Sequence, residues 1–133
     1  MAFHPDNIND VEDFGALLPE EWFHIRVSKV VEKESKESGE PTVYLNLKVQ
    51  SEPHVGRVIP DTCSLQKHAL GKLKAYYKAC DKLPDGPGHD PETLMDCECY
   101  VKVTHTINKS TGDKRMSISP FHIKPLTDGM PSN

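Results

Sequence analysis

The sequence predicts a small, mainly β domain in which five short strands are interrupted by one helix between the third and the fourth strand. In several stretches apolar residues alternate with polar ones, which is the period of a half-buried strand. Between Cys63 and Cys80 the apolar spacing changes to that of a helix with one apolar face. At 133 residues the chain has the size of a single domain.

Charge divides the chain into regions. The net charge is −4, but six of the 20 acidic residues lie within residues 1–21, which contain no lysine or arginine. The sequence therefore predicts an acidic N-terminal arm (1–19), a folded domain (20–124) and a disordered tail (125–133). The arm is expected to be disordered, or to dock Phe14, Leu17 and Leu18 on the domain or on a second subunit.

The first two predicted strands carry the clearest alternation. Trp22–Glu32 places Phe23, Ile25 and Val27 on one face, and Thr42–Gln50 does the same with Val43, Leu45, Leu47 and Val49. The polar stretch between them, which ends in Gly39-Glu40-Pro41, is typical of a hairpin connection. A short third strand is predicted over Arg57–Pro60. It is expected to end at Pro60, because proline cannot donate a hydrogen bond to a strand ladder.

The helix follows Cys63 and contains Tyr76 and Tyr77 on its apolar face, so both rings are expected in the core. Ser64 is a candidate N-cap, and Gly71 lies within the helical pattern. After a loop rich in Pro and Gly, the fourth strand is predicted over Cys97–Ile107 and the fifth over Met116–Ile123.

This order of elements is that of an OB-fold, a five-stranded and partly open Greek-key barrel with one helix between strands 3 and 4. The domain 20–124 is therefore expected to be OB-fold-like. A small α+β sheet with the helix on one face has the same order and remains an alternative.

Enzymatic function is not expected. The sequence contains no phosphate-binding loop, dinucleotide fingerprint, nucleophile elbow or H-E-x-x-H motif. Its seven histidines are scattered, and its four cysteines, Cys63, Cys80, Cys97 and Cys99, lack paired zinc spacing. We therefore expect no catalytic residue, no cofactor and no metal, with the cysteines acting as small buried hydrophobes.

A binding surface is better supported, because basic and aromatic residues share the polar face of the predicted strands. Lysine and arginine can contact the phosphates of a single strand while aromatic rings stack on its bases. Tyr44 and Tyr100 have an alternative role as a cross-strand pair, and Trp22 as a plug at the barrel end. The lysines of the helix form a secondary basic patch, or simply its solvated face. The candidate nucleic-acid-binding residues are Arg26, Tyr44, Lys48, Tyr100, Lys102, Trp22, Lys72 and Lys74.

Two segments of the chain resemble a family of small phage OB-fold proteins that was long catalogued as a domain of unknown function. The first runs from Phe23-His24-Ile25-Arg26-Val27 to Val43–Val49, and the second from Leu70–Tyr76 to Leu94–Val103. Proteins of that family are regarded as single-stranded DNA-binding proteins of replication and recombination modules. The resemblance implies the same fold and function here.

The leading hypothesis is therefore sequence-tolerant binding of single-stranded DNA in phage replication or recombination, in the host cytoplasm. The expected partners are single-stranded DNA and phage or host replication and recombination proteins, without a membrane, and a homodimer is one assembly to test. The alternative is a non-enzymatic structural or adaptor protein that binds another protein through the acidic arm or an open strand edge. A small metal-dependent enzyme is a third reading, which would require a stoichiometric metal.

Overall fold

The computed structural model describes residues 16–36 and 39–132 of the chain. The prediction of a mainly β domain is confirmed, and one α-helix, α1 (Gly71–Ala79), lies between β3 and β4 along the described chain. In chain order the strands are β1 (Trp22–Glu34), β2 (Pro41–Val49), β3 (Val58–Ser64), β4 (Glu98–Lys102), β5 (Thr104–Ile107), β6 (Lys114–Ser117) and β7 (Ile123–Pro125).

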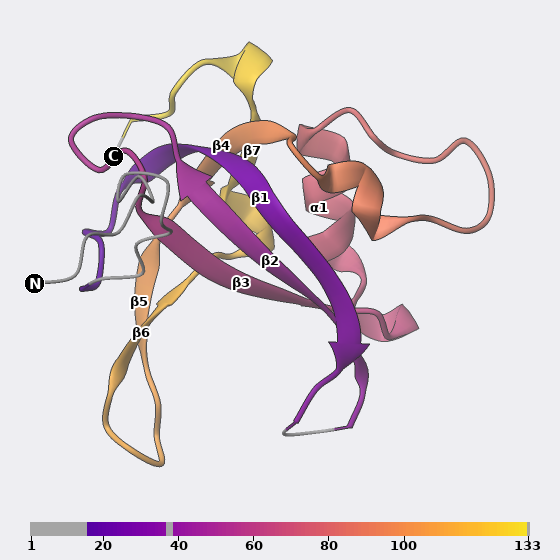
Figure 1. Cartoon of the computed structure of the whole chain (residues 1–133), viewed down its shortest axis with the longest axis horizontal. Coiled ribbons are helices and arrows are strands. Elements are labelled where there is room, and N and C mark those ends of the chain that lie inside the picture. Colours follow the sequence, from indigo (N-terminus) through magenta and orange to yellow (C-terminus); the bar gives the residue numbers. More distant parts are fainter. Residues whose placement is uncertain (1–15, 37–38, 133) are drawn as a thin grey trace, which may run out of the picture.

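Five strands form one curled antiparallel sheet, in the order β3-β2-β1-β4-β7 (Figure 1). The long strand β1 holds the sheet together, because Trp22–Arg26 pairs with β4 and Ile25–Glu34 pairs with β2. The register shifts between Val27 and Lys29, and such a bulge bends a strand and increases its twist. The sheet therefore curves into a half-barrel instead of lying flat.

The remaining two strands, β5 and β6, form a separate hairpin that projects from the sheet (Figure 1). The prediction of single strands over 97–107 and 116–123 is wrong at this point. Val103 is fully buried between β4 and β5, and its amide donates to the Glu21 carbonyl, which interrupts the ladder. Between β6 and β7 the buried Ile118 is followed by a 3-10 turn, Pro120–His122, which ends the extended conformation.

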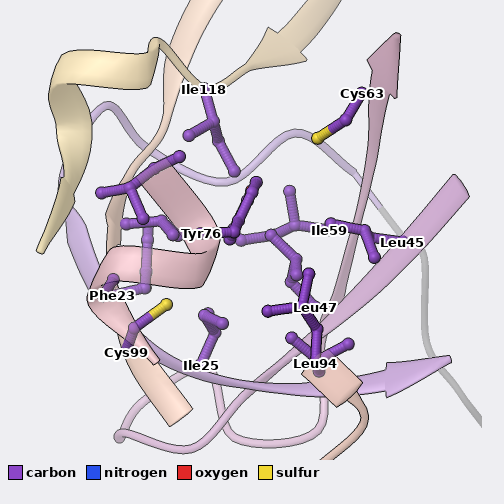
Figure 2. Packing of buried hydrophobic residues seen from close by; sticks show 14 of the residues in the cluster. Phe23, Ile25, Leu45, Leu47, Ile59, Cys63, Tyr76, Leu94, Cys99 and Ile118 are labelled. Atoms are coloured by element: carbon purple, nitrogen blue, oxygen red, sulfur yellow. The ribbon is translucent and has the colours of Figure 1, made fainter. Parts of the chain in front are cut away.

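The concave side of the sheet is filled by a single hydrophobic cluster (Figure 2). Alternate residues of β1 and β2 supply it, as their period predicted, and α1 adds Leu73, Tyr76 and Tyr77 from its apolar face. Tyr76 is fully buried, so the prediction that both helix tyrosines belong to the core is confirmed. Burial of this apolar surface is the main favourable contribution to folding.

The boundaries of two elements differ from the prediction. β3 continues past Pro60 to Ser64, because Pro60 faces outward at the edge of the sheet, where proline is tolerated. Ser64 is not the N-cap of α1: its hydroxyl accepts a hydrogen bond from the Gln66 amide, and α1 begins only at Gly71 with Leu70 before it.

The ends of the described chain pack on the sheet. Leu18 is buried in the core, and its carbonyl is hydrogen-bonded to the His105 ring. The carbonyl of Ala16 accepts a hydrogen bond from Arg57. Residues 1–15, most of the predicted arm, lie outside the described residues. The predicted disorder from residue 125 is wrong for Pro125, which pairs with Cys99, and for the 3-10 turn Leu126–Asp128.

Two features are absent from the described residues. None of the helices there has the length and apolar character needed to cross a membrane. Nor does any group of three or more His, Cys, Asp or Glu side chains in those residues have an arrangement that could hold a metal ion.

Candidate nucleic-acid interface

The outer face of the curled sheet is polar, because the apolar residues of each strand point into the core. On β2 the outward residues are Tyr44, Asn46 and Lys48, which are half-buried. Across the ladder, Tyr44 lies opposite Thr62 of β3 and Val31 of β1. A flat aromatic ring thus lies in the middle of a polar surface.

Two hairpins leave the sheet on either side of this surface. Figure 1 shows the β1–β2 and β5–β6 hairpins extending from the same side of the molecule, with β3 between them. Residues from both hairpins and from β2 and β3 line a groove of about 580 Å³. Its walls are Lys33, Ser35, Lys36, Glu40, Thr42, Tyr44, Thr62, Ser64 and Arg115.

The groove continues along the free edge of β3. A second hollow, of about 520 Å³, shares Thr62 and Arg115 with the first and extends past Pro60 to the base of the β5–β6 hairpin. The two hollows together form an open channel along β3, bordered by the hairpins. We call this channel the hairpin groove.

The charge of the hairpin groove is mainly positive. Lys33, Lys36 and Arg115 contribute cations and Glu40 an acid, while the second hollow adds the paired Asp61 and Lys72. None of the three cations forms an ion pair with another residue of ranges 16–36 and 39–132. All three are exposed to solvent.

Strand alternation sorts the charges of β1 between two sides of the sheet. Lys33 lies in the hairpin groove, whereas the neighbouring Glu32 is opposite the buried Val43 and acts electrostatically on Tyr77 of α1. The acid is thus directed away from the groove, and the lysine into it.

The ring of Tyr44 already has a cationic neighbour. The Nζ atom of Lys33 lies 4.8 Å from the ring centroid, within the range of a cation–π contact. A stacked base would share or replace this contact.

The other sequence-predicted residues do not join Tyr44 in one site. Arg26 is paired with Asp96 at 3.4 Å and lies opposite Lys48 on β2. Further along the sheet, Tyr100 packs edge-on against His24, with ring centroids 5.7 Å apart. Trp22 lies opposite Lys102 and packs edge-on against His122 at 5.8 Å.

The two predicted site lysines on α1, Lys72 and Lys74, lie beside other groups of the protein. Lys72 is bound to Asp61, with Nζ 2.5 Å from the carboxylate. Lys74 borders an apolar cavity of about 200 Å³ between α1 and the loop that contains Leu83 and His89. Neither lysine contributes to the described cationic wall formed by Lys33, Lys36 and Arg115.

Asp61 is the centre of a buried polar cluster beneath the hairpin groove. Its carboxylate points inward from β3 and accepts hydrogen bonds from Lys72 and from the Tyr76 hydroxyl. Burial raises the pKa of the Asp61 carboxyl above its ordinary value, and the Lys72 ammonium opposes this rise. The cluster fastens α1 to β3 and so supports one border of the groove.

All four cysteines are reduced, and three of them lie together. Cys80, directly after α1, shares hydrogen bonds with Cys97, directly before β4, and with Cys99 in β4. The bond to Cys99 contributes most to raising the pKa of Cys80. Burial raises the pKa of Cys63 to about 12 and that of Cys97 to about 11. Few thiolates therefore exist near neutral pH, which makes these groups weak nucleophiles.

The sequence prediction missed the three cations that line the groove beside Tyr44, namely Lys33, Lys36 and Arg115. Lys33 and Lys36 belong to the stretch assigned to a hairpin connection, and Arg115 to the loop before the fifth predicted strand. Their sequence signal was weak, because acids and lysines are mixed within residues 32–40. Only the strand alternation, which places Lys33 on the same face of the sheet as Tyr44, could have identified one of these three cations.

Comparison of the sequence with protein-family models and with curated proteins found no match.

Proposed function

We propose that the chain is a sequence-tolerant single-stranded DNA-binding protein with an OB-fold-type barrel. The observation that carries the proposal is the hairpin groove, in which three cations and an aromatic ring line one hollow, with one cation, Lys33, against the ring. Phosphates would bind Lys33, Lys36 and Arg115, and a base would stack on Tyr44. Stacking on a ring does not depend on which base is present, so the binding would tolerate any sequence.

The strand arrangement supports the OB-fold part of the proposal. OB-folds bind oligonucleotides on the face of strands 2 and 3, between the loop after strand 1 and the loop before strand 5. Here the groove lies on β2 and β3 and is bordered by the β1–β2 hairpin and by the β5–β6 hairpin, which precedes β7. We place the activity in phage DNA replication or recombination, in the host cytoplasm, as the family resemblance implies.

Tyr44→Ala tests the base-stacking role. We expect this variant to bind oligo-dT more weakly by roughly 1–3 kcal/mol, because the ring surface available to one base is lost. Titration of a fluorescently labelled oligo-dT, followed by anisotropy, measures the change. Tyr44→Phe is the matched control and should retain nearly full affinity, since it keeps the ring. Equal affinities of the Ala and Phe variants would rule out stacking on Tyr44.

A further inference from the structure

Phe121 is the most exposed large apolar residue among the described residues, with 84% of its surface accessible. It lies in the 3-10 turn between β6 and β7, at the end of the sheet opposite to β3. The proposed groove does not use it, and it packs in no hydrophobic cluster of the described chain.

The turn that carries Phe121 is held firmly. The Ser119 hydroxyl caps it by accepting a hydrogen bond from the Phe121 amide, and Pro120 fixes the first backbone angle of the turn. On the far side, His122 packs against Trp22 and Ile123 is buried. The backbone is thus ordered while the ring extends into solvent, so a ligand would bind the ring at little further cost in backbone entropy.

Beside the ring is a hollow of about 380 Å³ between α1 and β7, which lie next to each other (Figure 1). Ala75 and Ala79 of α1 contribute small side chains to it, and Lys78 and Lys124 are the cations at its border. Asp128 is its one acid among the described residues. Lys124 is also the ladder partner of Tyr100 on the outer face of the sheet.

We propose that this hollow is a second contact for the same DNA strand, in which a base stacks on Phe121 and phosphates meet Lys78 and Lys124. The excess of positive charge favours a polyanion over a second copy of this chain, whose identical patch would repel it. An exposed aromatic ring beside cations is also the combination that single-stranded nucleic acid binds. The inference rests on the proposed function of the hairpin groove.

The test compares two lengths of labelled oligo-dT, one of about 6 nucleotides and one of about 30, because one OB-fold covers roughly 4–16 nucleotides. Phe121→Ala should weaken binding of the long oligonucleotide roughly five- to hundredfold and leave that of the short one unchanged. Phe121→Trp should retain the affinity, since it keeps a stacking ring. Val55→Ala, which truncates another exposed apolar residue, is the matched control and should bind both lengths like the wild type.

The outcomes separate the two proposals. Failure of the wild-type protein to bind either oligonucleotide would contradict the hairpin groove and, with it, the second contact. Binding of both lengths by Phe121→Ala with wild-type affinity would overturn only the second contact. A change of oligomeric state in Phe121→Ala at constant DNA affinity, measured by light scattering, would instead identify Phe121 as a subunit contact and would also overturn the inference.

Discussion

Replacing Lys33, Lys36 and Arg115 together with glutamine should weaken binding of oligo-dT by about 100-fold at about 0.1 M salt. Each side chain is expected to contribute about 1 kcal/mol through one phosphate contact, and about 1.4 kcal/mol corresponds to a factor of ten. All three side chains are exposed, so the fold should be unaffected. The slope of log K against log salt should also become shallower by about 2, since each lost phosphate contact of a single strand removes about 0.7.

Lys67, Lys74 and Lys82 provide the control for this triple variant. All three are exposed and lie outside both the hairpin groove and the hollow at Phe121. Replacing them with glutamine changes the net charge by the same amount. An equal loss of affinity in the two triple variants would mean that overall charge, and not the groove, attracts the DNA.

Lys72→Met is expected to have the largest effect on stability. It leaves the Asp61 carboxylate buried without its cation, and breaking a buried pair in this way costs roughly 3–5 kcal/mol at neutral pH. Urea unfolding, followed by the fluorescence of the single tryptophan Trp22, measures this loss. In the double variant Asp61→Asn/Lys72→Met most of the stability should return, because no buried charge remains.

The same variant should show a characteristic dependence on pH. The pKa of Asp61 in the folded state is above its ordinary value of 3.8, so the folded protein retains this proton in a range where the unfolded chain has lost it. Stability is therefore highest below that range and decreases as the pH rises through the folded-state pKa. Without Lys72 the pKa of the Asp61 carboxyl rises further, because the cation that opposed the rise is lost. Lowering the pH from about 7 to about 5 protonates more of this carboxyl and should therefore restore part of the stability of Lys72→Met. A loss that does not change with pH would contradict this account of the cluster.

The sequence was sufficient for the parts of the fold that depend on local periodicity. The alternation around Leu45 and Leu47 defined the buried face of β2, and the spacing of Leu73 and Tyr76 defined that of α1. The breaks near Val103 and Ile118 could not be predicted, because both residues continue the apolar pattern while the backbone changes direction. Tertiary packing determines where such breaks occur, and the local sequence pattern does not indicate them.

The candidate site was less accessible to sequence reasoning. Tyr44 was predicted on the polar face because its position within β2 follows from the alternation. Arg115 could not be associated with it, since they meet only through the placement of two hairpins on one side of the sheet. Lys72 was assigned to a basic patch because residues 66–80 contain four lysines and no acid. Its ion-pair partner Asp61 lies beyond the predicted end of the third strand, so the pair could not be predicted.

The central claim is that the hairpin groove binds single-stranded DNA through its cations. The most direct test is titration of the wild-type protein with labelled oligo-dT over a series of salt concentrations. We expect saturable binding at low salt and a plot of log K against log salt with a slope of about −2 or steeper, since at least three phosphates are contacted. The absence of binding at low salt, or an affinity that does not change with salt, would contradict the claim.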